Sequence, residues 1–197
     1  MSFASTSSSA VHPSRSNGAS HFDRDSDVPH GLDDLLALDH DRLTDLYAAA
    51  TVPDLAAISG DLRGRMLAIP SLGTNVEGGR RGAILARAIK RFAASRRFPW
   101  LGKSFTPAGD DRGEGVNRVF SDRLKLFRFE TRVARSLGGD FDAVQLDYDR
   151  PGNPFFIRAI KDEIRELRPG LYLGQAWILI GKRRPVLGLW FGLEHTP

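Results

Sequence analysis

Apolar and polar residues alternate with a period of two along most of the chain from residue 100 onward. This period is typical of β-strands that bury one face. About eight sequential strands with mostly short connections favour an up-and-down meander, and that number closes a small barrel. The predicted fold is therefore mainly β, an antiparallel barrel accompanied by helices. The predicted strands span residues 61–70, 100–105, 116–120, 124–133, 143–149, 162–167, 171–180 and 186–193.

Helical spacing replaces the alternation in parts of the first half of the chain. The leucines at 32–36 indicate one short helix, and Asp39 is a predicted N-cap for a second helix that ends before Pro53. The strongest helical pattern, residues 82–95, has an apolar and a basic face and is expected to cover one barrel end. A short helical turn is expected within 155–160.

The amino-terminal stretch differs from the rest in composition. Residues 1–29 are rich in Ser, Asp, His and Gly and contain little to bury, which predicts a disordered tail. Residues 30–197 are predicted to form a single barrel domain with N-terminal helices. The amino end lacks the pattern of a secretory signal, and no window approaches the ~20 apolar residues of a membrane-spanning helix. A cytoplasmic protein is therefore expected.

Basic residues only slightly outnumber acidic ones, but several of them gather in one segment. The formal net charge is +4, and Arg87, Lys90 and Arg91 lie opposite the apolar face of the helix predicted over 82–95. Such a helix can contact anionic headgroups, so a weak membrane contact through these residues is one expectation. No aromatic residues interleave with the basic ones to stack on bases, so specific nucleic-acid binding is not predicted.

The closing hairpin is apolar on both faces of both strands. Trp177 and Trp190 belong to this hairpin, and each shares its strand side with both apolar and small or polar residues. Alternation therefore does not decide which face is inside. It indicates cover on both sides, by the barrel interior and by the preceding helices.

Known catalytic and metal-binding patterns do not occur in the predicted domain. The carboxylate pairs Asp147/Asp149 and Asp162/Glu163 have no histidine at ligand spacing, so neither a metal site nor a cofactor is predicted. The sequence has no cysteine, and its Gly-rich loop lacks the phosphate-binding pattern. A general acid or base would have to be Asp147, Tyr148, Asp149, Lys103 or Glu163, each of which is also an ordinary structural residue.

Charged residues within two of the predicted strands allow two interpretations. They lie on a solvated outer face, with cross-strand pairs such as Arg128 with Asp147, or some of them point into a barrel cavity and orient a ligand. Tyr148 is ambiguous because its ring favours burial and its hydroxyl needs a partner.

Several short motifs occur in a recognisable order. They are Trp100-Leu-Gly-Lys-Ser-Phe105, Leu146-Asp-Tyr-Asp149, Ile157-Arg-Ala-Ile-Lys-Asp-Glu-Ile164, Gly170-Leu-Tyr-Leu-Gly174 and Phe191-Gly-Leu-Glu194. This order resembles a group of uncharacterised bacterial proteins and, more distantly, the lipocalin-like small barrels named for a Gly-x-Trp-x-Gly motif. The sequence departs from the naming motif, since Trp100-Leu101-Gly102 supplies only its second half. The resemblance implies a calycin-type barrel and, by fold analogy, a small apolar ligand.

Three functions follow as expectations. The first is non-catalytic binding of a small hydrophobic or lipid-like molecule in the barrel. The alternative is an enzyme, an isomerase, cyclase or hydrolase acting on a hydrophobic molecule, with Asp147, Tyr148 or Asp149 as acid or base. The third is a peripheral membrane-associated protein. For the first function, the expected apolar lining is Phe127, Phe129, Tyr148, Trp177 and Trp190, and the expected anchors for an anionic head group are Arg128, Arg158 or Arg165.

Overall fold

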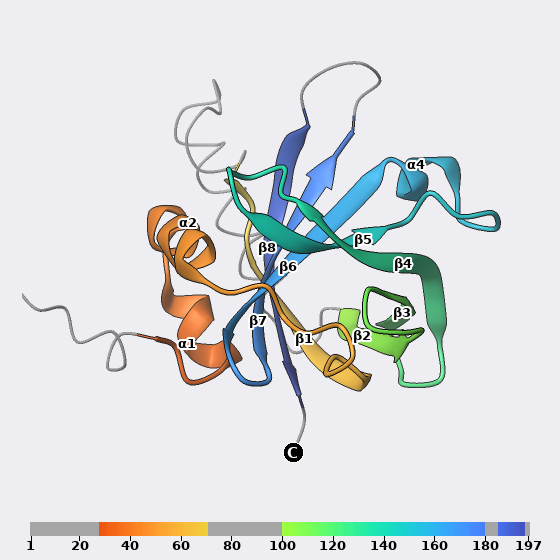
Figure 1. Ribbon diagram of the computed structural model, residues 1–197, viewed down its shortest axis with the longest axis horizontal. Helices are drawn as coiled ribbons and strands as arrows, with labels where there is room; N and C mark the ends of the chain where they lie inside the picture. Colours follow the sequence, from red (N-terminus) through yellow and green to blue (C-terminus); the bar gives the residue numbers. More distant parts are fainter. Residues whose placement is uncertain (1–27, 71–99, 180–184, 196–197) are drawn as a thin grey trace, which may run out of the picture.

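The structure is a computed structural model, and it describes residues 28–70, 100–179 and 185–195 (Figure 1). The tail predicted over 1–29 therefore lies almost wholly outside the described residues. The same holds for the Gly-rich loop, for the basic helix predicted over 82–95 with Arg87, Lys90 and Arg91, and for the turn of the closing hairpin.

The described strands form a closed barrel in which each strand pairs with the next and β8 pairs with β1 (Figure 1). All pairings are antiparallel, which confirms the predicted mainly β fold and its eight-stranded barrel. The strands are β1 (Gly60–Ala68), β2 (Trp100–Pro107), β3 (Arg112–Val119), β4 (Lys125–Arg135), β5 (Asp142–Asp147), β6 (Ile160–Arg168), β7 (Leu171–Ile178) and β8 (Val186–His195).

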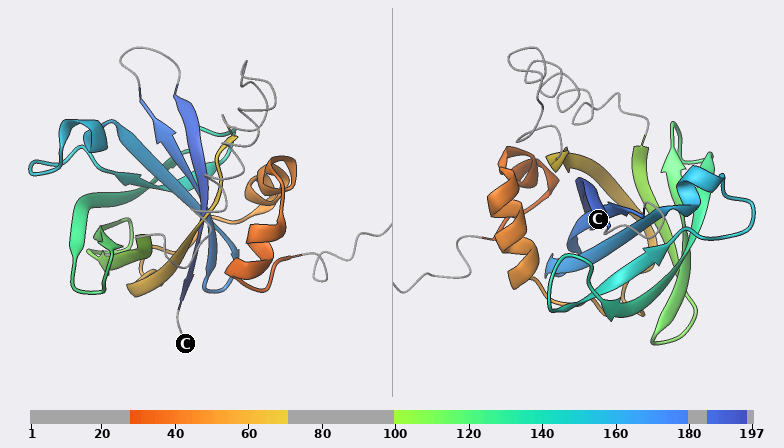
Figure 2. Two further views of the ribbon diagram at one scale, coloured as in Figure 1. Left: turned by 180° about the vertical axis from the view of Figure 1, so that it is seen from behind. Right: turned by 90° about the horizontal axis from the view of Figure 1, so that it is seen from above.

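Two helices cover one outer flank of the barrel, α1 (Leu32–Ala37) and α2 (His40–Ala49) (Figure 2). The predicted N-cap of the second helix is confirmed, because the Asp39 side chain accepts a hydrogen bond of 2.9 Å from the Arg42 backbone N–H. This bond satisfies one of the backbone donors that every helix start leaves open. A third helix, α4 (Phe155–Arg158), lies between β5 and β6, where a helical turn was predicted.

The apolar side chains form two separate clusters, one inside the barrel and one beneath the helices. Phe129, Leu146 and Phe191 belong to the inner cluster, whereas Leu35 and Trp190 belong to the outer one. The closing hairpin serves both clusters, since Phe191 points inward and its neighbour Trp190 packs against the helices. This division explains why alternation alone did not distinguish the two faces of the hairpin.

Irregular positions in β2 and β4 change which side chains point inward. The pairing of β2 with β3 shifts register between Trp100 and Gly102, and Gly102 has a φ of 135°. A Cβ at Gly102 would lie 2.0 Å from the Leu62 carbonyl oxygen, so only glycine fits this close approach. In β4 the extra residue is Phe127, with a φ of 60°. Both irregularities border the cavity described below, as β-bulges commonly do at functional sites.

Candidate functional site

A cavity of about 370 Å³ occupies one end of the barrel. Seven of the eight strands contribute lining residues, and Tyr148 lines the cavity from just after the end of β5. Its apolar lining is Met66, Trp100, Val119, Phe127, Ile157, Ile160, Ala176, Leu189 and Phe191, and its polar lining is Lys103, Asn117, Tyr148 and Asp162. Most of the wall is thus apolar, as in typical small-molecule sites, with polar groups restricted to a few side chains.

The four polar side chains form one hydrogen-bonded group, which we call the buried polar cluster (Lys103, Asn117, Tyr148 and Asp162). Lys103 Nζ donates to Asp162 Oδ2 at 2.8 Å, to Asn117 Oδ1 at 2.9 Å and to the Tyr148 hydroxyl at 2.5 Å. The Tyr148 hydroxyl donates to Asp162 Oδ2 at 2.9 Å and accepts from Asn117 Nδ2 at 3.0 Å. The Trp100 indole N–H also donates to Asn117 Oδ1, at 2.9 Å.

Burial sets the titration of this cluster. Desolvation lowers the pKa of Lys103, and the opposite charge of Asp162 limits that effect. Desolvation and the nearby Asp162 raise the pKa of Tyr148 well above its ordinary value. Three acceptors around one nitrogen require three N–H groups, so the geometry corresponds to a protonated Lys103.

Aromatic rings surround the Lys103 ammonium on several sides. Its Nζ lies 5.2 to 5.4 Å from the ring centroids of Trp100, Phe129, Tyr148 and Phe191. Rings at this distance attract a cation through their electron-rich faces. The rings and Asp162 together compensate for the hydration that Lys103 loses inside the barrel.

The expected ligand-binding residues divide between the cavity and other places. Phe127 and Tyr148 line the cavity. Phe129 lies in the inner cluster, where its ring centroid is 5.3 Å from that of Tyr148. Arg128 is exposed on β4, and Arg158 is paired with Asp149 at 2.6 Å outside the cavity.

Besides Arg128, Phe129 and Arg158, three more of the expected residues do not line the cavity, which corrects their predicted position. Trp190 follows inward-facing Leu189 in β8 and therefore faces the helices, where its indole N–H donates to His40 Nδ1 at 2.9 Å. Trp177 lies beside Gly138 and does not line the cavity. Arg165 follows inward-facing Ile164, so its guanidinium lies against the α2 end, 4.2 Å from the Phe141 ring centroid.

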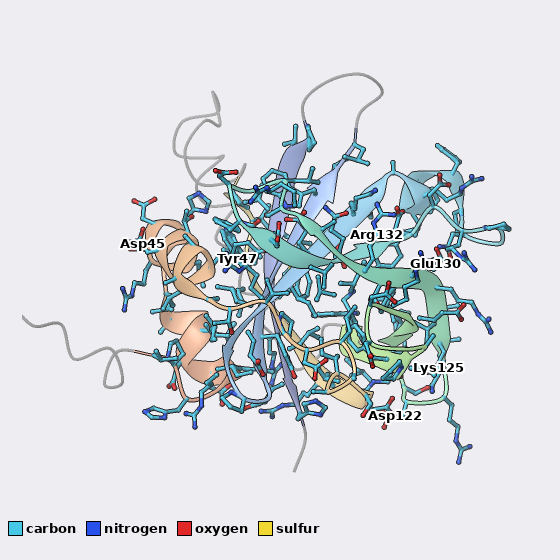
Figure 3. All side chains as sticks on the ribbon, in the orientation of Figure 1. Asp45, Tyr47, Asp122, Lys125, Glu130 and Arg132 are labelled. Carbon is cyan, nitrogen blue, oxygen red and sulfur yellow. The ribbon has the colours of Figure 1, made fainter. Side chains whose placement is uncertain are left out.

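Of the three residues expected as acid or base in the enzyme alternative, Tyr148 lines the cavity, whereas Asp147 and Asp149 do not. Asp147 is bonded to Lys161 at 2.9 Å, and although partial burial raises its pKa, the hydrogen bonds from Lys161 and the Asp149 backbone lower it overall. The expected partner Arg128 is replaced by Arg132, at 4.0 Å, because the register sets Glu130 opposite Asp147. Glu130 and Arg132 are both exposed on β4 (Figure 3).

One member of the buried polar cluster, Asn117, is not among the predicted site residues. Lys103 is predicted as a general acid or base candidate and Asp162 as part of a carboxylate pair, but no sequence pattern relates the two. The sequence feature that could have indicated Asn117 is its position in a predicted strand, between Val116 and Val119. An amide side chain that is buried there needs hydrogen-bond partners.

Two further searches cover the described ranges only. Within residues 28–70, 100–179 and 185–195, no three or more His, Asp and Glu side chains are grouped so that they could hold a metal ion. Among the helices of these same ranges, none has the length and apolar character needed to cross a membrane.

Comparisons with known proteins add little to this geometry. No protein-family model matches the chain. No curated protein matches it either. A solved structure, the crystal structure of a protein from Thermomonospora curvata, is similar to this chain with a TM-score of 0.41 and 15% sequence identity. The similarity covers 81% of this chain and 89% of that chain.

Proposed function

We propose that the barrel binds a small, largely apolar molecule in its end cavity. The observation that carries this proposal is an apolar cavity of about 370 Å³ that ends on one buried polar cluster. This volume lies within the roughly 300–1,000 Å³ range of small-molecule sites. A barrel interior filled by its own side chains would not support the proposal.

The resemblance of the sequence to lipocalin-like small barrels supports the same function, although a fold by itself does not specify an activity. Burial of apolar surface would supply the affinity. Each buried CH₂ group contributes about 0.8 kcal/mol, so about ten of them reach the roughly 8 kcal/mol of a micromolar complex before the costs of association.

Titration with the neutral fluorescent hydrophobe N-phenyl-1-naphthylamine tests this proposal. A saturable rise in fluorescence is expected with the wild-type protein. Ala176→Phe places a ring in the cavity and should weaken binding about tenfold or more, because it fills the space that the probe occupies. Val186→Phe is the matched control, since Val186 is 47% exposed on the neighbouring strand and does not line the cavity.

Two results would contradict binding in the cavity. One is the absence of saturable fluorescence with the wild-type protein. The other is equal affinity in wild type and Ala176→Phe, provided that both variants show the circular dichroism of the folded protein. Native mass spectrometry of protein purified from its own host would then identify any molecule that fills the cavity in the cell.

A second candidate function is catalysis on the bound molecule. The observation that favours it is that Lys103, Tyr148 and Asp162 meet at one hydrogen-bonded cluster in the cavity, with shifted pKa values for Lys103 and Tyr148. Mass spectrometry of a ligand recovered after incubation would detect its conversion. Tyr148→Phe should stop that conversion and leave binding within a few-fold. Recovery of the chemically unchanged ligand from the wild-type protein would argue against an enzyme.

A further inference from the structure

The charges at the cavity balance each other. Lys103 and Asp162 are the charged side chains in the described lining, and they form an ion pair of 2.8 Å with only 3% and 7% of their side chains exposed. The polar end of the cavity therefore has no net charge. A carboxylate ligand would find the cation of the described lining, Lys103, already neutralised, and it would bring a second negative charge close to Asp162.

The donors of the buried polar cluster are also fully used. All three Lys103 N–H groups are given to acceptors within the cluster. Asn117 donates to the Phe127 carbonyl at 3.2 Å and to the Tyr148 hydroxyl, and the Tyr148 proton is given to Asp162. A ligand group that only accepts hydrogen bonds would thus have to displace one of these bonds.

One acceptor of the cluster has no donor among the residues that the structure describes. Both bonds to the Asp162 carboxylate, from Lys103 and from Tyr148, end on Oδ2. Among the described residues nothing donates to Oδ1, although Asp162 is only 5% exposed and lines the cavity. An oxygen of a cavity-lining carboxylate that has no protein donor gains a charge-assisted hydrogen bond when a ligand supplies the donor.

We propose that the ligand is a neutral, hydroxyl-bearing apolar molecule, an alcohol or phenol, whose O–H donates to Asp162 Oδ1. This inference rests on the proposed binding function and specifies the chemical class of the ligand. It replaces the expected anionic head group, whose anchors Arg128, Arg158 and Arg165 all lie outside the cavity lining. The apolar walls hold the body of the molecule, and Asp162 selects its polar group.

Isothermal titration calorimetry at pH 8 with three small probes tests this assignment of the ligand class. 1-Octanol and its isomer heptyl methyl ether have the same number of heavy atoms, but only the alcohol can donate a hydrogen bond. A hydrogen bond to a charged group corresponds to about tenfold to a hundredfold in affinity, so 1-octanol should bind more tightly than the ether by at least about tenfold. Octanoate should bind more weakly than both.

The substitution Asp162→Asn tests the residue. It removes the open acceptor's charge and leaves Lys103 without its counter-ion, so the alcohol should lose its advantage and octanoate should bind more tightly than to wild type. Asp147→Asn is the matched control, because Asp147 pairs with Lys161 and does not line the cavity. It should keep the wild-type order of the three probes.

The outcomes separate the two proposals. Equal binding of 1-octanol and the ether to wild type would overturn the role of Asp162 and leave apolar binding intact. Tighter binding of octanoate than of 1-octanol would likewise overturn the neutral-donor assignment. No binding of either neutral probe, together with no binding of the fluorescent hydrophobe, would overturn the proposed function itself. The wild-type comparison needs no variant, so it stands even if Asp162→Asn does not fold.

Discussion

Lys103 and Asp162 join opposite walls of the barrel. Their strands, β2 and β6, are four strands apart in either direction around the closed sheet, and yet Lys103 Nζ lies 2.8 Å from Asp162 Oδ2. The two strands are not paired with each other, so this ion pair is a direct contact across the barrel interior. Because both side chains are almost fully enclosed, each charge depends on the other.

Removal of one partner should therefore cost much more than removal of both. Lys103→Met leaves the Asp162 charge buried without its partner and should lower the free energy of unfolding by about 3–5 kcal/mol. The double variant Lys103→Met/Asp162→Leu should recover most of that loss. Urea denaturation of the four proteins of this mutant cycle measures both effects.

A surface pair provides the control for this cycle. Arg63 and Glu194 are 2.6 Å apart, but the Arg63 side chain is 52% exposed. Arg63→Met should therefore change stability by less than about 1 kcal/mol. A similar small change for Lys103→Met would show that the interior pair contributes little.

The three tyrosines of the chain should all resist ionisation in the folded state. Desolvation raises the pKa of Tyr47 and of Tyr148, and it raises the pKa of Tyr172 to about 12. The unfolded chain, whose tyrosines titrate near their ordinary value of 10.0, loses these protons first. The contribution of Tyr172 to stability is full below pH 10 and is lost as the pH rises through about 12, and the contributions of the other two also begin to fall above pH 10.

Tyrosinate absorbance measured against pH checks this expectation. The folded protein should show little tyrosinate near pH 10, whereas the same protein in concentrated urea should show a normal titration. The lowered pKa of Lys103 has the opposite effect on the pH dependence of stability, because the folded protein loses this proton before the unfolded chain does. This lysine is one group acting in that direction, against three tyrosines. A normal titration of all three tyrosines without loss of circular dichroism would contradict their burial.

Two glycines lie directly opposite aromatic residues on paired strands, and their hydrogens make room for the rings. A Cβ at Gly174 would lie 2.2 Å from Cζ of Phe191, and one at Gly115 would lie 2.3 Å from Cζ of Phe129. Gly174→Ala should destabilise the protein by about 1–3 kcal/mol, as overpacked cores do. Adding Phe191→Leu should restore part of the loss in thermal denaturation. No recovery would indicate that backbone conformation, not the ring contact, requires glycine.

Glu163 fixes the connection between β4 and β5. Its buried carboxylate accepts hydrogen bonds from the Ser136 hydroxyl at 2.6 Å, the Leu137 N–H at 2.8 Å and Gln145 Nε2 at 3.0 Å. Glu163→Gln turns one acceptor into a donor that faces other donors, and it should cost about 2 kcal/mol. The measurement is urea denaturation, with faster amide exchange expected at Leu137.

Glu114→Gln is the control for this substitution. Glu114 is exposed and pairs across the strands with Glu130, so neutralising it removes a like-charge contact. Its stability should be unchanged or slightly higher. Equal losses for both glutamates would mean that the Glu163 network has no special role.

The strands were predictable because each has one face inside the barrel, and alternation follows directly from that geometry. The N-cap at Asp39 was predictable because its signal lies within three residues of the chain. The closing hairpin could be placed but not oriented, because Trp190 and Phe191 are both buried, one beneath the helices and one in the barrel.

The buried polar cluster could not be predicted from local sequence patterns. Its members come from β2, β3, β6 and the end of β5, and they meet only through the register of the closed sheet. The register shift at Gly102 also brings Trp100 and Lys103 to the same cavity, although a regular strand would place them on opposite faces. A lysine between Leu101 and Phe105 in a two-residue period was the one local sign of an unusual position.

The pairing of β8 with β1 has a consequence during synthesis of the protein. Strands β1 to β7 emerge from the ribosome first, and until β8 follows, β1 and β7 both present unpaired backbone groups along an edge. Open edges of this kind recruit strands from other chains. The nascent barrel should therefore depend on chaperones or on rapid translation of residues 186–195, and interruption there should yield aggregates instead of a smaller soluble barrel.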